Sequence, residues 1–408
     1  MNFHHQRKHS VWTAVLFSLL VAAPVPYCHA QSKDAAPSTE RPLFEMDLRN
    51  YGYKSHVRGK RDYWSIAFAE NDDLVLGWTT FDDPDAGKRT GYLTAAPSHL
   101  HALVLNARTG QKKIAREWAA STFYANIHPV AKGEFLICTG DAIRLLSHNF
   151  DVVHELALSR FGPCTANEIS PSGRSFSIDT GVGKNFQRGV MSTELFAPVA
   201  TWSNEARGVH FNDAYLAGNC TPNSELCVRK FDASWVPLVF NTADRHSRVR
   251  SFLNESALVL TTRSGLVVVT TEGNLLFHVD LQSKQSIGET TVSSSGQRLA
   301  VVQMRMRGVT NEVLDMYAFA SDDQVIVYDL LEGKAIYARK VKGTSPWPPF
   351  TEHRNRLAIS SDGALLAIFD DGMLSVYQLP APNLKIARKS ASSEPYVPNQ
   401  GDAVRARQ

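Results

Sequence analysis

Residues 169–178 (ISPSGRSFSI), 292–301 (VSSSGQRLAV) and 359–368 (ISSDGALLAI) align with one another without gaps. Each begins with an apolar residue and a serine, continues with two turn-forming residues and a glycine, and ends in a second apolar run. Glycine tolerates the positive φ that tight hairpin turns require. Each stretch therefore predicts two short antiparallel strands joined at Gly173, Gly296 or Gly363.

A second repeated unit occurs in two places, at residues 102–110 (ALVLNARTG) and 325–333 (VIVYDLLEG). In both, an apolar run ends in an Asn or Asp that stands four residues before a glycine. Asn106 and Asp329 therefore occupy equivalent positions in the two copies.

Short apolar runs separated by Gly, Asn, Asp, Ser and Pro dominate the rest of the chain, and long amphipathic helical patterns are absent. Even spacing of short strands fits a sandwich, a barrel or a propeller, and internal repetition favours the propeller. The two repeated units resemble successive parts of a blade in WD-repeat and related bacterial propellers. The Gly-His and Trp-Asp signatures are missing, and only Tyr328-Asp329 comes near the second, so the resemblance implies a fold and no functional residues.

Blade-like units divide the chain into seven, although six or eight blades also fit the pattern. Their predicted starts lie near Tyr63, Tyr124, Ala166, Arg207, Arg248, Ile287 and Arg356. The last unit has only three strands, and residues 43–48 (LFEMDL) alternate as a half-buried strand does. We therefore expect an all-β, seven-bladed propeller closed by an N-terminal strand in the last blade, which removes the open edges of the ring.

The first thirty residues have the layout of a secretory leader: a basic start, an apolar stretch and a small-residue exit at Ala30. The predicted organisation is a leader at 1–30 cleaved after Ala30, a linker at 31–41, the propeller at 42–380 and a disordered tail at 381–408. We expect a secreted or periplasmic protein without a membrane span. A lipid anchor on Cys28 is a weaker alternative, because the bulky Tyr27 precedes it.

The formal net charge is +3, and much of the basic excess lies in the leader and the tail. The body lacks the clustered basic face of nucleic-acid-binding proteins, so nucleic acid is not an expected partner.

Four cysteines remain after the leader, an even number typical of disulfides in an oxidising compartment. Cys220 and Cys227 enclose a short turn-rich loop and are the first predicted pair. Cys138 and Cys164 are a second predicted pair, with two buried thiols as the alternative. A metal site is disfavoured, because no CxxC occurs.

The longest insertions, at residues 79–99, 181–192, 219–225 and 305–323, all fall between the second and third strands of a blade. These loops share one face of a propeller, which makes that face the candidate binding site. The residues proposed to contact a ligand there are Trp78, Phe81, Asp83, Asp85, Arg89, Tyr92, His99, Lys184, Phe186, Arg188, Arg305, Arg307 and Tyr317.

The sequence gives only weak signals for a metal, phosphate-binding or catalytic site. Asp83, Asp85 and Gly87 resemble the opening of a calcium loop, but Thr94 occupies the position of the required glutamate. His99 and His101 share a strand face without an identifiable third ligand, and residues 179–189 lack the phosphate-loop spacing. No nucleophile motif is recognisable, so we predict neither metal nor cofactor and no catalytic residues.

Three functions remain open. The first is a binding or scaffold module for a protein, peptide or glycan. The second is an enzyme (hydrolase, lyase or quinone-dependent dehydrogenase) with a site on the ring axis. The third is a purely structural envelope component, which would have no concave site. Convergent axial His, Asp or Arg side chains with shifted pKa values would favour the enzyme. The sequence does not indicate an oligomeric state.

Overall fold

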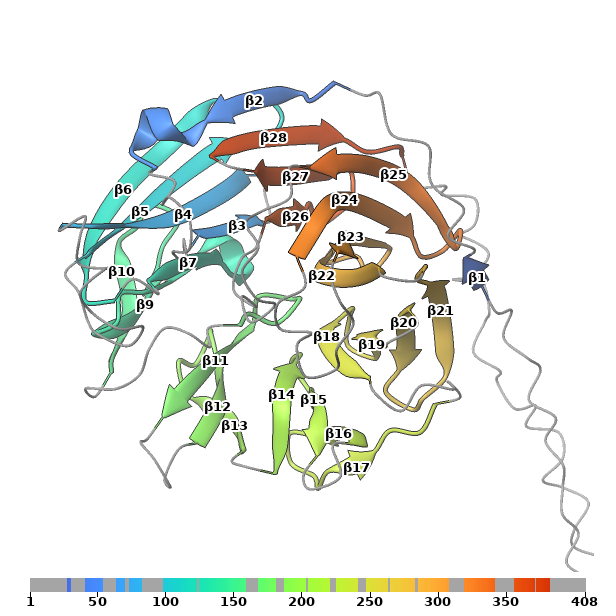
Figure 1. Cartoon of the computed structure of the whole chain (residues 1–408). Coiled ribbons are helices and arrows are strands. Elements are labelled where there is room, and N and C mark those ends of the chain that lie inside the picture. Colours follow the sequence, from blue (N-terminus) through green and yellow to red (C-terminus); the bar gives the residue numbers. More distant parts are fainter. Residues whose placement is uncertain are drawn as a thin grey trace, which may run out of the picture.

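The computed structural model describes residues 28–30, 41–53, 64–69, 73–82, 98–122, 125–158, 168–180, 187–202, 205–220, 225–240, 247–262, 265–282, 285–307, 319–341, 356–370 and 372–381. Within these residues the regular structure is β-strand, apart from the short 3-10 turns η1 (Leu48–Tyr51) and η2 (Ala131–Gly133). The strands form seven sheets arranged in a ring, which confirms the predicted seven-bladed propeller (Figure 1).

The first three blades follow the chain from the inside of the ring outward. Blade 1 contains β3 (Trp64–Phe68), β4 (Asp73–Phe81), β5 (Ser98–Asn106) and β6 (Lys112–Ala120). Blade 2 contains β7 (Asn126–Pro129), β8 (Phe135–Cys138), β9 (Ala142–Leu146) and β10 (Val152–Ala157). Blade 3 contains β11 (Ser175–Thr180), β12 (Gln187–Ser192) and β13 (Pro198–Trp202), and a single bridge from Ile169 to Phe176 stands in place of its inner strand.

The next three blades have four strands each. Blade 4 contains β14 (Ala206–Phe211), β15 (Tyr215–Cys220), β16 (Glu225–Lys230) and β17 (Val236–Pro237). Blade 5 contains β18 (Arg248–Phe252), β19 (Ala257–Thr261), β20 (Gly265–Thr270) and β21 (Leu275–Asp280), and β1 (Cys28–Ala30) pairs in parallel with β21. Blade 6 contains β22 (Gln285–Val292), β23 (Arg298–Arg307), β24 (Phe319–Asp329) and β25 (Lys334–Val341).

Blade 7 closes the ring as predicted. It contains β26 (Leu357–Ile359), β27 (Leu365–Asp370) and β28 (Met373–Gln378), and its outer strand is β2 (Phe44–Asp47). In the antiparallel pairing, Phe44 lies opposite Val376 and Met46 opposite Leu374. The strand is shorter than the predicted 43–48, because the chain turns into η1 at Leu48, which is buried.

The repeated sequence units form the predicted turns. Gly173, Gly296 and Gly363 have φ values of 73°, 66° and 73°. The serine three residues before each glycine accepts a backbone N–H bond, for example from Leu365 to Ser360 Oγ at 2.9 Å. In the second unit, Asn106 Oδ1 accepts bonds from the backbone of the turn that follows it. Asp329 Oδ1 does the same in blade 6.

The apolar core is divided into seven clusters, and each cluster lies between two neighbouring blades. A blade inside the ring is covered on both faces, so its central strands are apolar along their length. In β19 all five residues are buried, and in β20 five of the six are. Burial of each such side chain contributes about 1.5 to 3 kcal/mol, which makes the seven interfaces the main source of stability.

Candidate functional site

The four predicted insertions follow the second strands of blades 1, 3, 4 and 6, and therefore leave the ring on the same face. Residues 83–97, 181–186, 221–224 and 308–318 of these insertions lie outside the described residues. The loops are shorter than the sequence suggested, because hairpin pairing continues into them. Residues 187–192, for example, form β12 rather than loop.

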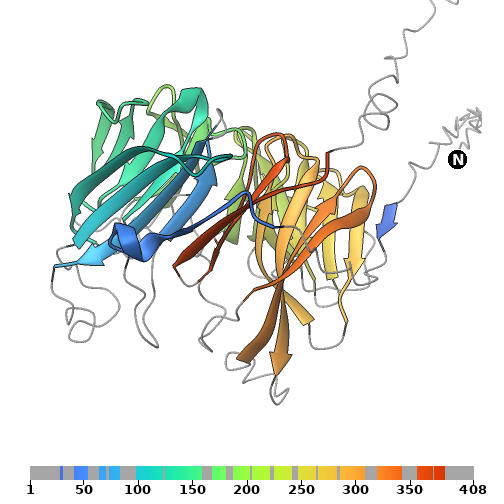
Figure 2. The same cartoon turned by 90° about the horizontal axis from the view of Figure 1, so that it is seen from above.

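Two of these hairpins are longer than the others and stand on either side of blade 7. In blade 1, β4 and β5 have 9 residues each; in blade 6, β23 and β24 have 10 and 11. Between them, β27 and β28 have 6 residues each. Three additional residues at about 3.3 Å per residue extend a strand by about 10 Å. Figure 2 shows the blade 6 hairpin projecting beyond the ring at the bottom of the view.

Along β4 of blade 1, the side chains on the face toward blade 7 change from apolar to polar. Leu74, Leu76 and Trp78 lie on the face of β4 that packs against blade 7. Thr80 follows on the same face, since side chains two apart in a strand point the same way, and Asp82 comes directly after the strand. The polar side chains thus begin directly after the core-facing row.

Trp78 belongs to the core rather than to an exposed surface. Its side chain is 4% exposed and packs with Leu76 and Phe369. The cavity beside it has a volume of about 10 Å³. That is room for about one water molecule and not for a ligand. The proposed ligand contact at Trp78 therefore needs correction: the indole supports the site from beneath.

Four of the other proposed contact residues lie on strands of three different blades. For two of them, Phe81 and Arg307, only the backbone is described. Phe81 ends β4, with its backbone opposite Ser98, and Arg307 ends β23 opposite Phe319. Arg188 lies on β12, opposite Trp202, and Arg305 is exposed on β23. The proposed contacts that lie outside the described residues are Asp83, Asp85, Arg89, Tyr92, Lys184, Phe186 and Tyr317.

His99 lies at the centre of a row of closely spaced polar and charged side chains on the exposed part of blade 1. Its Nε2 is 2.8 Å from Asp82 Oδ1, and its Nδ1 is 2.8 Å from Glu117 Oε1. The second oxygen of Glu117 is 3.3 Å from His101 Nδ1. His101 Nε2 in turn lies 2.7 Å from Thr80 Oγ1. Four side chains from three strands, together with Asp82 just after β4, thus form one continuous polar network beside blade 7.

This network is not a metal site. Among the described residues, no group of three or more His, Cys, Asp or Glu side chains has an arrangement that could hold a metal ion. Both ring nitrogens of His99 and of His101 already face a protein partner. The two histidines were recognised in the sequence, whereas Glu117 and Thr80 were missed, because they come from the neighbouring strands.

The inner strands carry further ionisable groups that link neighbouring blades. Between blades 3 and 4, Glu168 Oε1 lies 2.6 Å from His210 Nδ1. Between blades 5 and 6, Arg250 Nη2 donates to the Ile287 carbonyl at 3.1 Å. Between blades 6 and 7, Glu289 Oε1 accepts the Leu357 N–H at 2.9 Å. These contacts connect neighbouring blades along the inside of the ring.

Two of the inner-strand groups have shifted pKa values. Burial raises the pKa of Glu289 to about 7, against the opposing effect of backbone hydrogen bonds from Arg356 and Leu357 and of the Arg356 charge. Burial also lowers the pKa of His128 to about 4. These residues lie on blades 6 and 2, which are not neighbours in the ring. The shifts therefore do not identify the convergent pair that an axial catalytic site requires.

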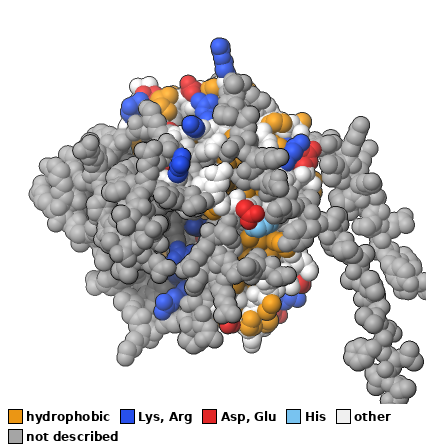
Figure 3. Space-filling model, turned by 45° about the vertical axis from the view of Figure 1, so that its right-hand side comes forward, with side chains coloured by type: hydrophobic (Ala, Val, Ile, Leu, Met, Phe, Trp, Pro, Cys, Tyr) orange, Lys and Arg blue, Asp and Glu red, His pale blue; other side chains and the backbone are white. Residues whose placement is uncertain are grey.

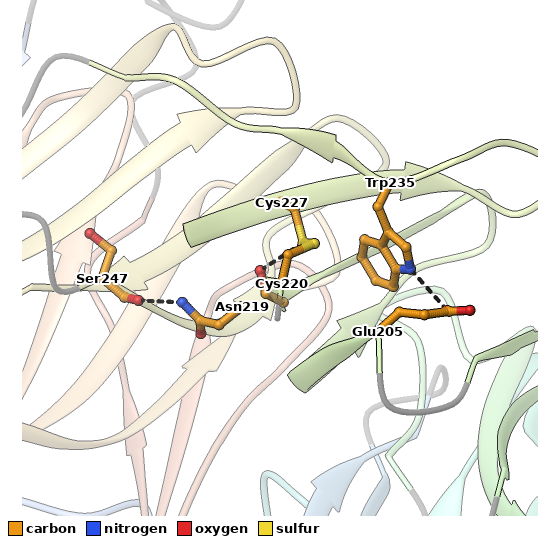
Figure 4. The surroundings of a disulfide bond; sticks show 7 residues. Glu205, Asn219, Cys220, Cys227, Trp235 and Ser247 are labelled. Atoms are coloured by element: carbon orange, nitrogen blue, oxygen red, sulfur yellow. Dashed lines mark hydrogen bonds between the residues drawn. A yellow bond between two sulfur atoms is a disulfide. The ribbon is translucent and has the colours of Figure 1, made fainter. Parts of the chain in front are cut away.

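A disulfide joins Cys220 and Cys227 across the β15–β16 hairpin, as predicted, with a Cα–Cα distance of 5.9 Å (Figure 4). It closes the base of the insertion in blade 4. Asn219 beside it donates to the Ser247 carbonyl of blade 5 at 3.0 Å. Cys138 is disulfide-bonded as well. Its predicted partner, Cys164, lies outside the described residues, so that pairing stays a prediction.

Exposed apolar side chains lie mainly on the outer strands of blades 2 to 5, including Val152, Val199, Val236 and Leu276. On the side turned forward in Figure 3, hydrophobic side chains form several separate patches among charged ones. Within the described residues, no helix has the length and apolar character to span a membrane.

Comparison with known proteins gives a likeness at the level of fold. No protein-family model and no curated protein sequence matches the chain. Hsv2 from Kluyvelomyces marxianus is 10% identical, with a TM-score of 0.48 over 80% of this chain and 95% of that one. The mitotic checkpoint complex contains a chain that is 12% identical, with a TM-score of 0.48 over 90% and 98%. BamB from Moraxella catarrhalis is 15% identical, with a TM-score of 0.37 over 77% and 93%.

These values transfer no function and no site residue. The seven sheets, their strand order and the closure by β2 define the architecture without them. The chain is thus a seven-bladed β-propeller.

Proposed function

We propose that this chain is an exported binding module that engages a protein, peptide or glycan through the face carrying the four insertions. The observation that carries the proposal is the pair of long hairpins, β4–β5 and β23–β24, that extend past blade 7 on that face. Strand pairing holds the bases of both hairpins, so loops built on them are presented from a rigid support.

The proposed export rests on the leader pattern at 1–30, and the Cys220–Cys227 disulfide supports it, since disulfides persist mainly in oxidising compartments. In the mature protein, residues 31–41 serve as a linker, residues 42–380 as the propeller and residues 381–408 as a tail. The partner is a protein, peptide or glycan that reaches the loop-rich face from outside the ring.

The proposal is tested by trimming each hairpin. In the first variant, Asn-Gly replaces residues 80–99, so that the turn closes on the Thr79–Leu100 pair. In the second, Asn-Gly replaces residues 305–322 and closes on the Met304–Asp323 pair. A control carries a Gly-Ser insertion between Glu194 and Leu195, in a turn on the opposite face.

Each purified protein is immobilised and exposed to the envelope and culture-fluid fractions of the host, and to a glycan array. We expect a specific ligand that the wild type and the control retain and that at least one trimmed variant loses. Equal retention by both trimmed variants, with unchanged thermal unfolding, would overturn the proposal.

A further inference from the structure

Three side chains in the blade 1 network stand in the order nucleophile, base and carboxylate. Thr80 Oγ1 lies 2.7 Å from His101 Nε2, and His101 Nδ1 lies 3.3 Å from Glu117 Oε2. The residues belong to the adjacent strands β4, β5 and β6. His101 lies opposite Glu117 and two pairs along the ladder from the Thr80–His99 pair. This order of contacts is the geometry by which hydroxyl nucleophiles are activated on unrelated folds.

The protonation of His101 suits a general base. The negative charge of Glu117, 3.3 Å from Nδ1, favours the tautomer with its proton on Nδ1, in which Nε2 accepts the hydroxyl of Thr80. Burial lowers the pKa of His101, and the charge of Glu117 acts in the opposite direction. The imidazole is therefore neutral at neutral pH and free to take up a proton at Nε2.

The base is held in place from two sides. The ring of Trp78 stacks on His101, with 5.4 Å between the centroids and 11° between the planes. Glu117 is fixed through its other oxygen by His99, which Asp82 holds in turn. A base whose orientation is set by a second layer of contacts needs little reorganisation when it reacts.

The site is accessible as well as ordered. The side chain of His101 is 19% exposed, and those of His99 and Glu117 are 37% and 53% exposed. Thr80 is half-buried on the part of β4 that extends past blade 7. The hydroxyl and the imidazole are therefore both partly accessible to solvent.

We propose that Thr80 is the nucleophile of an acyl-transfer site that hydrolyses carboxylic esters, with His101 as the general base and Glu117 as its positioning residue. The inference goes beyond the binding role proposed above, and neither depends on the other. It assigns the hydrolase chemistry to blade 1 rather than to the ring axis.

The reaction balances without a further reagent. Thr80 Oγ forms a bond to the ester carbonyl carbon, while its proton passes to His101 Nε2. The carbon–oxygen bond to the alcohol breaks, and the leaving alcohol takes that proton. Water then attacks the acyl-Thr80 ester with His101 again as base, which releases the carboxylic acid and restores the hydroxyl.

The test uses the full-length mature chain with p-nitrophenyl butyrate as substrate and a fluorophosphonate as covalent probe. We expect ester hydrolysis above the buffer rate and a single probe adduct that peptide mass spectrometry assigns to Thr80. Thr80→Val and His101→Gln should each reduce the rate on the order of 100-fold or more, the usual contribution of a nucleophile or general base. Thr80→Ser should retain activity.

Thr79 provides a matched control on the same strand. Its hydroxyl donates to the Ala125 carbonyl at 3.1 Å, so it faces blade 2 and lies outside the network. Thr79→Val should leave both the rate and the adduct unchanged. Thermal unfolding of every variant separates a lost nucleophile from a lost fold.

The role of Glu117 is read from the pH profile. Because its charge raises the pKa of His101, Glu117→Gln should move the acid limb of the rate profile to lower pH and reduce the rate on the plateau. A structural role alone would leave the limb in place. The proposal is overturned if the folded Thr80→Val variant retains the wild-type rate or if the probe adduct forms on another residue. It is also overturned if the wild-type protein shows neither ester hydrolysis nor a probe adduct.

Discussion

The carbonyl of Gly363, in the first turn of blade 7, accepts a hydrogen bond of 2.9 Å from Nη1 of Arg298 in blade 6. The side chain of Arg298 is 1% exposed, its Nη2 donates to the Pro380 carbonyl at 2.6 Å, and it lies 3.7 Å from Asp329. One buried guanidinium thus joins the two repeated sequence units of blade 6 to the corresponding turn of blade 7.

Removing this cation should be among the more damaging single changes. Arg298→Met leaves Asp329, which is 3% exposed, without its buried counter-charge, and should lower the free energy of unfolding by about 3 kcal/mol. Urea unfolding measures the change. Adding Asp329→Asn should recover part of the loss, and a fully additive double variant would show that the two groups are not coupled.

The three equivalent turn glycines should differ in their tolerance of alanine. All have φ near +70°, a conformation that costs an alanine about 1 kcal/mol. A Cβ added at Gly173 would lie 2.6 Å from the backbone nitrogen of Ala131, which cannot easily move. A Cβ at Gly363 would lie 2.8 Å from the flexible side chain of Arg298, and one at Gly296 would lie 3.3 Å from Asn254 Nδ2. Thermal unfolding should therefore show Gly173→Ala as the most destabilised variant and Gly296→Ala as the least. The reverse order would contradict this assignment of the clash.

Loss of the Cys220–Cys227 bridge should destabilise the propeller modestly. The bridge closes a short loop, so the double change to alanine should lower the free energy of unfolding by about 2 kcal/mol through the entropy of the unfolded chain. The double variant is a cleaner test than a reductant, because Cys138 is disulfide-bonded too. Urea unfolding of the variant and the wild type under non-reducing conditions provides the measurement, and equal midpoints would refute the prediction.

Glu289 should make stability depend on pH in a direction opposite to that of an ordinary glutamate. Its pKa is raised from 4.5 to about 7, so its stabilising contribution is present below pH 4.5 and is lost as the pH rises through 7. The stability of Glu289→Gln relative to the wild type should increase by at most about 3 kcal/mol between pH 4.5 and pH 8. Urea unfolding at both pH values tests this, and a constant difference would mean that the carboxyl titrates normally in the fold.

The fold could be predicted from the sequence at those places where the same residue types form the same turn in two or more blades. Ser293 and Ser360 stand in aligned motifs and make the same backbone bond. In blade 4, Asn212 performs the same role through bonds from Ala214 and Tyr215. Several residue types satisfy one backbone geometry, so the repeat fades in sequence while it persists in structure.

The candidate site was accessible only in part. His99 and His101 are two residues apart and show their shared strand face directly. Their partners Thr80 and Glu117 depend on the pairing register of three strands, which a single sequence does not specify. The placement of Trp78 had a usable signal, because Leu74, Leu76 and Trp78 alternate along β4 as a core-facing row.

Closure by β2 also sets the order of events during synthesis. Phe44–Asp47 leaves the ribosome early, whereas its partner strand, Met373–Gln378, leaves only after six blades have been made. Until then the first strand has no place to pair, and pairing over so long a separation is slow. Ring closure therefore depends on complete synthesis: a chain interrupted before Met373 keeps an open ring, with exposed strand edges that proteases and chaperones can recognise.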